Sequence, residues 1–458
     1  MKPLFAGVTI VDGPEDWQII QRDKQGFGSL SLIGTWETQE QEFSIQARLV
    51  NESNQMPVTN YLDWQTAALD TVNKQFRITL NQIPQGGLYR IETRIRRPNA
   101  LDARAMRGDC IHHIGIGDLY IIAGQSNASG TGKGEVEDGP MLGVHMFAND
   151  ERWKLGSHPL EDATNTLHPI TITSVFHGHS PWIAFAKAIF LKTSVPIGLI
   201  PTALGGSPIS MWIHGEDCSG VLFDNMAEML EKAGGKAAGL VWHQGESDTS
   251  TSGLKEYKHR FQQFVAETRK LLQDDAFPIF TAQLNGVVSP NADDFAWSEM
   301  RQIQRELSLE LGRVYLIVTI GLGMSDEIHN SSLSNVVIGQ RYASAALEHV
   351  YGLPISSSFP DLVAAAFVDE DKRQLQLQFA HVGGDWTPHR AITDFRVEDE
   401  LGHLDIDLVK LLDAGIVHLN LQREPQGITK VTGLYGANPR VSLLDDNCRG
   451  ITPFIVRI

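Results

Sequence analysis

Three residues of this chain have the types that serine-based acyl transfer requires. Ser126 lies in the sequence Gly-Gln-Ser-Asn, and Asp326 lies three residues before His329. A serine hydroxyl is a weak nucleophile unless an imidazole accepts its proton, and a carboxylate must hold that imidazole in the correct tautomer. The spacing of three allows one turn of chain to bring the Asp326 carboxylate to the far nitrogen of His329. We therefore predict that Ser126, Asp326 and His329 are catalytic.

Acyl transfer also needs hydrogen-bond donors where the oxyanion of the tetrahedral intermediate develops. We predict three donors: the backbone N–H of Ser126, the backbone N–H of Gly206 and the side-chain amide of Gln244. Glycine suits position 206 because no Cβ would obstruct the substrate carbonyl. Other interpretations stay open for each motif alone. Ser126 would also suit a helix cap, Gly205-Gly206 a simple turn, and Gln244 a buried anchor for its loop.

Residues that adjoin these motifs are predicted to line the substrate site: Gln125, Asn127, Trp212, His243 and Glu246. The rings of Trp212 and Trp182 could stack on a pyranose face, although core positions would explain both tryptophans equally well. Glu246 is also consistent with a buried polar anchor. The sequence therefore favours these positions as a lining without fixing which of them contact substrate.

Four histidines, His112, His113, His177 and His179, lie outside any recognised metal-ligand spacing. We interpret them as structural or substrate-lining residues and predict a reaction that uses no metal and no other cofactor. The three cysteines are far apart in the sequence, so they indicate neither a disulfide framework nor a C-x-x-C site.

Apolar runs before these motifs predict the strands that position them. Five such runs alternate with longer segments of helical spacing, which is typical of a parallel sheet covered by helices on both faces. The runs cover residues 118–123, 197–203, 239–243, 279–284 and 314–320. Four of them lead into Gly-Gln-Ser-Asn, Leu-Gly-Gly-Ser, His-Gln-Gly-Glu and Ser-Asp-Glu-Ile-His. Because ligands bind beyond the carboxyl ends of parallel strands, we predict that these motifs meet at one edge of the sheet.

The two ends of the chain have a different pattern of apolar and polar residues. Short segments that alternate apolar and polar residues, separated by Gly and Pro, predict antiparallel strands of β-sandwich-like modules on both sides of the central part. We therefore expect an N-terminal β domain over residues 1–112, a catalytic α/β domain over 113–353 and a C-terminal β domain over 354–458.

The composition excludes some classes of partner. The chain has 38 basic and 55 acidic residues, a net charge of -17, and no long run of Lys or Arg. We expect no nucleic-acid partner, because phosphate binding needs a concentrated basic face; neutral substrates fit better. No stretch reaches membrane-spanning length and the N-terminus is a poor signal peptide, so we expect a cytoplasmic protein without membrane contact. The oligomeric state stays open.

Several sequence blocks, taken together, carry a resemblance to a known family. They lie at 117–127, 198–212, 242–248, 297–304, 326–329 and 339–341. Their combination resembles the catalytic domain of the sialate O-acetylesterases and related carbohydrate acetylesterases of the SGNH-hydrolase superfamily. The resemblance covers the middle of the chain, and flanking β modules are usual in such enzymes.

This resemblance implies a flavodoxin-like core and an esterase that removes O-acetyl groups from sugars through an acyl-enzyme. It implies the same triad and the same glycine and glutamine in the oxyanion hole. Three positions depart from the usual pattern: Ser207 and Ser210 stand where Thr and an acidic residue are more common, and Asn330 stands where Pro is common. None of these departures removes a catalytic atom, but they leave the leaving group open.

Other functions remain compatible with the sequence. The substrate could be xylan or another acetylated polysaccharide, or the enzyme could be a short-chain lipase or thioesterase on the same fold. No long apolar lid segment is visible, which disfavours long acyl chains. A catalytically decayed carbohydrate-binding protein is a further alternative, but decay usually removes a triad residue and all three are present.

Overall fold

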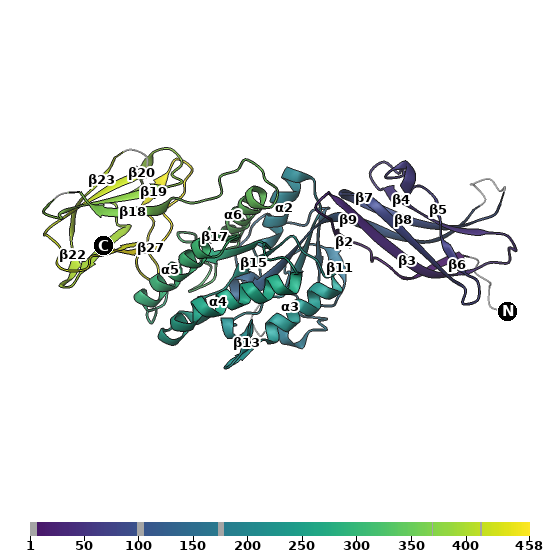
Figure 1. Ribbon diagram of the computed structural model, residues 1–458, viewed down its shortest axis with the longest axis horizontal. Helices are drawn as coiled ribbons and strands as arrows, with labels where there is room; N and C mark the ends of the chain where they lie inside the picture. The colour runs from purple at the N-terminus through teal and green to yellow at the C-terminus, as the bar shows by residue number, and fades with distance from the viewer. Residues whose placement is uncertain (1–6, 99–104, 173–177, 369, 413–414) are drawn as a thin grey trace.

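The chain forms an elongated molecule in which three parts follow one another along its longest axis (Figure 1). The computed structural model describes residues 7–98, 105–172, 178–368, 370–412 and 415–458. Antiparallel strands form each end, and a sheet with helices forms the middle. Separate hydrophobic clusters fill the two end parts, and two more cover the opposite faces of the central sheet.

All five predicted strands lie side by side and parallel in the central sheet. The order is β12-β9-β15-β16-β17, so the first strand in sequence lies second, as in flavodoxin-like folds. These strands span Met106–Gly124 (β9), Ile197–Pro201 (β12), Gly239–His243 (β15), Ile279–Gln283 (β16) and Val314–Val318 (β17).

The prediction of a five-stranded parallel sheet is nevertheless wrong in extent. β10 (Val144–Phe147) adds a sixth parallel strand beside β12, and β11 (Trp153–Leu155) pairs antiparallel with β10 at the edge. The sheet is therefore mixed. β10 has four residues and no helix directly before or after it, so its sequence gives only a weak strand signal.

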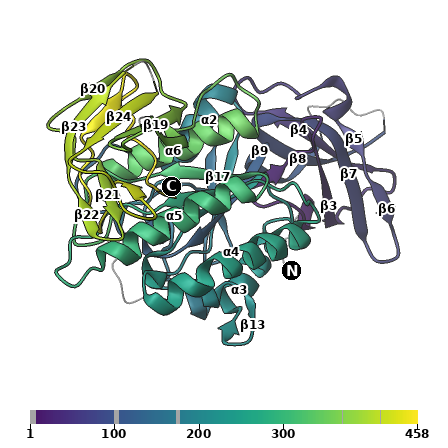
Figure 2. The same cartoon turned by 60° about the vertical axis from the view of Figure 1, so that its left-hand side comes forward.

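Five long helices cover this sheet, and Figure 2 shows them on its two sides. They are α2 (Trp182–Thr193), α3 (Val221–Lys232), α4 (Thr251–Leu272), α5 (Asp294–Glu310) and α6 (Ser332–His349). Side chains of α2 and α6 pack with Tyr120 and Ile122 of β9, whereas those of α3, α4 and α5 pack with Leu119 and Ile121. The alternation along β9 is the period of two that buries a central strand on both faces.

The N-terminal strands join the central sheet through one long strand. The first half of β9 pairs with β8 (Gly86–Arg96), which pairs with β4 (Ser44–Asn51), and the second half of β9 lies between β12 and β15. A second N-terminal sheet contains β1 (Gly7–Asp12), β3 (Phe27–Glu37), β7 (Gln75–Pro84) and β6 (Ala68–Asp70). The expected boundary at 112/113 therefore falls inside β9. We retain the division into three domains as a proposal.

Two sheets of the C-terminal part enclose their own hydrophobic cluster. One contains β18 (Asp361–Phe367), β19 (Gln374–Ala380), β24 (Ile416–Leu421) and β23 (Ile406–Leu411). The other contains β22 (Gly402–Leu404), β21 (Phe395–Asp399), β25 (Lys430–Gly433) and β27 (Phe454–Arg457). A short pair, β20 (Trp386–Pro388) with β26 (Leu443–Asp445), completes this part.

Among the residues that the structure describes, no helix is both long and apolar enough to cross a membrane.

Candidate active site

The predicted nucleophile lies directly beyond the carboxyl end of β9. Ser126 begins a one-turn helix, α1 (Ser126–Ser129), and is almost completely buried. Gly124, two residues earlier, has a φ of 131°, and a Cβ at this position would lie 2.2 Å from the carbonyl oxygen of His243. Glycine is therefore required here, because the strand must turn sharply against β15 before the serine is presented.

The structure brings Ser126, His329 and Asp326 together. Nε2 of His329 lies 3.0 Å from Oγ of Ser126, and Nδ1 of His329 lies 2.9 Å from Oδ2 of Asp326. The other carboxylate oxygen of Asp326 accepts the backbone N–H groups of Ile328 and His329 at 3.1 and 2.9 Å. These two bonds fold the segment into a turn that holds the carboxylate beside the ring.

The charge state of Asp326 suits an orienting carboxylate. Partial burial by itself would raise the pKa of Asp326, but hydrogen bonds from the His329 ring and from the backbone N–H groups outweigh it and hold the pKa well below its usual range. Asp326 is therefore ionised at neutral pH and can stabilise positive charge on His329.

A buried polar network links the three motifs. Asn127 Oδ1 accepts the backbone N–H of Asn330 at 3.0 Å, and Asn127 Nδ2 donates to Glu246 Oε1 at 2.7 Å. Asn127 and Glu246, which were both expected to line the substrate site, are hydrogen-bonded to each other and are buried as Ser126 is, so their lining role stays a prediction. Their contacts hold the turn at Ser126 against the loops that follow β15 and precede α6.

Two of the three expected oxyanion donors are free to act. Gly206 has a φ of 72°, its surroundings are open, and it is exposed. Within the described part of the chain, neither the Gly206 N–H nor the Ser126 N–H donates to a protein acceptor. The loop of Gly206 is held near the nucleophile because the N–H of Leu204 donates to Gly124 O at 3.1 Å.

The surroundings of Gln244 do not support its predicted role as an oxyanion donor. Its side chain is fully buried, and Nε2 lies within hydrogen-bond distance of three acceptors: Asp248 Oδ2 at 2.6 Å, Ser207 O at 3.2 Å and Gln125 Oε1 at 3.3 Å. An amide nitrogen has two N–H groups, so none remains for a substrate oxyanion. Gln244 therefore anchors its loop, and Gln125 acts as one of its partners.

Burial also overturns the substrate-lining assignment of Trp212 and His243. Both are fully inaccessible to solvent. The ring of Trp212 packs edge-on against Trp242 at a centroid distance of 5.2 Å, and its Nε1 donates to Ser207 Oγ at 3.1 Å. Trp182 is buried in the same way, with Nε1 donating to Ala128 O. Both tryptophans are core residues and cannot stack on a sugar.

The comparison with known families agrees with this arrangement. Residues 116–348 match the family described as "Carbohydrate esterase, sialic acid-specific acetylesterase". The chain belongs to this family. It is therefore a carboxylic ester hydrolase of the carbohydrate acetylesterase type, and the resemblance seen in the sequence blocks is confirmed.

Two individual proteins are similar to the chain, one in sequence and one in structure. The "Probable carbohydrate esterase At4g34215" of Arabidopsis thaliana is 28% identical over 258 residues, which cover 50% of this chain and 90% of that protein. The crystal structure of XAC1771, described as a novel carbohydrate acetylesterase from Xanthomonas citri, superposes with a TM-score of 0.67 at 19% identity. That superposition covers 96% of this chain and 98% of XAC1771, so the likeness in fold includes the flanking β parts.

One residue beside Asp326 was not anticipated. Nζ of Lys133 lies 3.3 Å from Oδ2 of Asp326, the oxygen that also contacts His329. Lys133 follows α1 in a glycine-rich segment, and that proximity in sequence to Ser126 was the available signal. Of the four histidines considered earlier, His113 lies 2.8 Å from Glu52 and near His112, away from Ser126, and His177 lies outside the described residues.

Proposed function

We propose that this acetylesterase removes O-acetyl groups from sugars through an acetyl-enzyme formed on Ser126. The observation that carries the proposal is the 3.0 Å contact between Ser126 Oγ and His329 Nε2, with Asp326 on the opposite ring nitrogen. This geometry allows the imidazole to accept the serine proton and the carboxylate to stabilise the imidazolium that results.

In the first half of the reaction, Ser126 Oγ attacks the acetyl carbonyl carbon while His329 Nε2 takes the hydroxyl proton. The oxyanion accepts hydrogen bonds from the backbone N–H groups of Ser126 and Gly206. Collapse of the tetrahedral intermediate breaks the ester C–O bond, and His329 returns the proton to the departing sugar oxygen. The sugar leaves with a free hydroxyl group, and the acetyl group stays on Ser126.

In the second half, water replaces the sugar. His329 takes a proton from the water as it attacks the acetyl carbon, and the same two N–H groups hold the oxyanion. The intermediate collapses to acetate, and His329 returns the proton to Ser126 Oγ. No cofactor enters either half, since the imidazole supplies the base and the acid in turn.

The proposed substrate class is an acetylated sugar, with O-acetylated sialic acid first and xylan-type or other acetylated polysaccharides as alternatives. The family description supports the first choice, and the name of XAC1771 supports only the broader class. A short-chain lipase or thioesterase activity would use the same triad, so the acyl chain and the alcohol must both be varied in the test.

The test is acetate release by wild type, Ser126→Ala and Ser344→Ala from O-acetylated sialic acids and acetylated xylo-oligosaccharides. Ser126→Ala should lower kcat by about 10⁴-fold or more and keep the wild-type circular dichroism spectrum. Ser344 lies on α6 and donates only to Gln340 O, so Ser344→Ala should keep full activity. Retention of more than a few per cent of kcat by Ser126→Ala would remove Ser126 from the mechanism. Fast cleavage of octanoyl esters with slow turnover of every sugar ester would favour the lipase alternative.

A further inference from the structure

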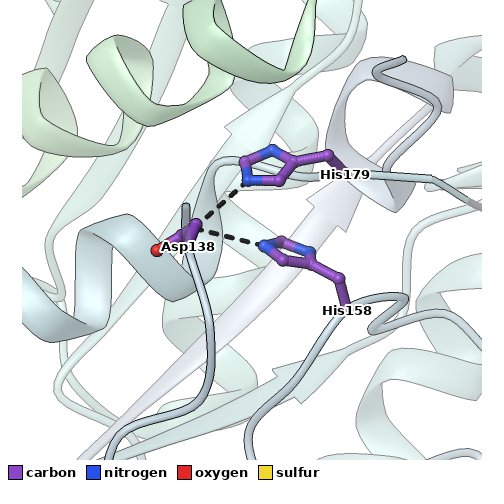
Figure 3. A group of neighbouring side chains, drawn as sticks. All are labelled: Asp138, His158 and His179. Carbon is purple, nitrogen blue, oxygen red and sulfur yellow. Dashed lines mark hydrogen bonds and ion pairs between the residues drawn. The ribbon is translucent and has the colours of Figure 1, made fainter. Parts of the chain in front are cut away.

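Two histidines and an aspartate converge outside the triad. His158 and His179 each place Nε2 3.2 Å from Oδ2 of Asp138. Both rings turn a nitrogen toward this carboxylate (Figure 3). The three residues come from separate segments: the loop before β10, the loop after β11 and the approach to α2. His179 lies beside the segment that follows Ser126, because its backbone pairs with that of Gly132.

His179 is close to Asp138 but poorly aligned with it. Its side chain is nine-tenths buried, and neither ring nitrogen has a hydrogen-bond partner in the described part of the chain. The distance from Nε2 to Asp138 would allow a hydrogen bond, so the direction of the ring prevents it. A buried imidazole whose close polar contact is poorly aligned is costly, and this ring lies against a carboxylate and a second imidazole.

We propose that Asp138, His158 and His179 bind a divalent transition-metal ion, with zinc as the best fit. Two imidazole nitrogens and one carboxylate oxygen are donors that zinc prefers, whereas Ca²⁺ and Mg²⁺ prefer oxygen alone. In a tetrahedral zinc site with bonds of about 2.1 Å, neighbouring ligand atoms lie roughly 3.4 Å apart. The two distances of 3.2 Å match this spacing. Water would occupy the fourth position.

Neighbouring groups support the ligand set. Lys187 Nζ donates to the other oxygen of Asp138 at 3.0 Å, which orients the carboxylate as outer contacts do in metal sites. His158 Nδ1 accepts the Ser180 N–H at 3.4 Å, a long contact that must yield when the ring proton moves to Nδ1 upon metal binding.

A second histidine–carboxylate cluster provides a contrast. Glu151, His168 and Glu228 also lie close together. There, Nζ of Lys232 pairs with both Glu151 and Glu228. The ammonium group thus already supplies the positive charge between the two carboxylates. In the Asp138 cluster, by contrast, Lys187 contacts the carboxylate oxygen that does not face the two imidazoles.

The ion would have a structural role. It would hold together the three loops that carry Asp138, His158 and His179. The reaction proposed at Ser126 does not use it. Metal content and turnover are therefore separate readouts, and a failure of one proposal leaves the other standing.

The test uses the full chain, treated with a chelator, desalted, and titrated with Zn²⁺ or Co²⁺. We expect one equivalent per chain, a rise in Tm of several degrees, and the strong visible Co²⁺ absorption of four-coordinate sites. Mg²⁺ should have no effect. His179→Gln should lower Zn²⁺ affinity by at least about a hundredfold. The matched control is His214→Gln, which changes a half-exposed histidine 3.0 Å from Asp224 and 3.4 Å from Glu267, and it should bind as wild type.

Three results would overturn the proposal. They are the absence of stoichiometric Zn²⁺ binding to wild-type protein, equal affinities in His179→Gln and wild type, and a six-coordinate Co²⁺ spectrum. The wild-type titration does not depend on whether His179→Gln folds. Turnover of p-nitrophenyl acetate by metal-free protein, measured well below its Tm, should equal that of the loaded protein; a loss restored by zinc would overturn the structural role.

Discussion

The buried carboxylate of Glu161 accepts a hydrogen bond of 2.7 Å from the backbone N–H of Ala203. Ala203 lies between β12 and the loop of Gly206, so Glu161 helps to position a proposed oxyanion donor. Burial raises the pKa of Glu161 to about 8, against the smaller opposing effects of hydrogen bonds from Asn149 and Ala203. The folded protein therefore keeps this proton over a pH range in which the unfolded chain has released it.

This shift predicts a pH-dependent stability with a definite sign. Below the ordinary pKa of 4.5 both states are protonated, and the folded state loses stability as the pH rises from there to about 8. Between pH 5 and pH 8 this group should cost about 3 kcal/mol of unfolding free energy. Glu161→Gln stays neutral and should remove this decline in urea titrations. The control is Glu135→Gln at an exposed position. Equal declines in both variants would contradict the prediction.

Gln244 provides the second prediction. Gln244→Ala should destabilise the protein by about 1–3 kcal/mol, because Asp248, Ser207 and Gln125 all lose a buried donor. The measurements are Tm and the separate kcat and KM values, with the exposed Gln340→Ala as control. A normal Tm with a kcat reduced by roughly a hundredfold or more and an unchanged KM would restore Gln244 as an oxyanion donor.

One buried cation makes several of the hydrogen bonds between the α/β part and the C-terminal part. Arg301 is fully buried and donates to four backbone carbonyls: Leu284 and Asn285 on one side, and Gly436 and Ala437 on the other. Burial lowers the pKa of Arg301 to about 9, but the group remains charged at neutral pH.

Loss of this cation should loosen the C-terminal part. Arg301→Met should cost roughly 3 kcal/mol or more, because four buried carbonyls lose their donor. Limited proteolysis should then release fragments cut after residue 353 sooner than in wild type or in the exposed control Arg440→Met. Identical proteolysis of all three proteins would show that other contacts hold this part in place.

Some of this site could be predicted from the sequence because its signals are local. The spacing between Asp326 and His329 fixes their contact within one turn, and Gly206 needs only its own φ and open surroundings. The five longer strands of the sheet have continuous apolar runs, so they too were predicted, whereas the four-residue β10 was not.

The errors concern properties that depend on distant segments. Trp212 is buried by Trp242 and by Phe264 of α4, and no pattern around residue 212 specifies that packing. The Gln244 amide is engaged by acceptors from three places in the chain, so its availability could not be read from its own motif. The Asp138 cluster is spread over three loops without a recognised spacing, which is why His179 attracted no metal assignment.

The last prediction concerns the acyl group. Both loops beside Ser126 are held by polar contacts: Asn127 Oδ1 accepts the Asn330 N–H at 3.0 Å, and Gly124 O accepts the Leu204 N–H at 3.1 Å. Ser207 Oγ stabilises the second loop by donating to Leu204 O at 2.9 Å. To admit a longer acyl chain the loops would have to separate and break these bonds, so we expect a small, rigid acyl site.

Each methylene that such a site cannot accommodate costs about 1–3 kcal/mol of transition-state binding. The value of kcat/KM should therefore fall by at least about tenfold from p-nitrophenyl acetate to the butyrate ester, and further to the octanoate ester. Ser207→Ala removes the hydroxyl that donates to Leu204 O and accepts from Trp212 Nε1, and it leaves Ser126, Asp326 and His329 unchanged. It should therefore loosen this loop and lower the ratio of acetate to butyrate turnover. A butyrate rate equal to the acetate rate in wild type would contradict the rigid site, because the loops would then yield without cost.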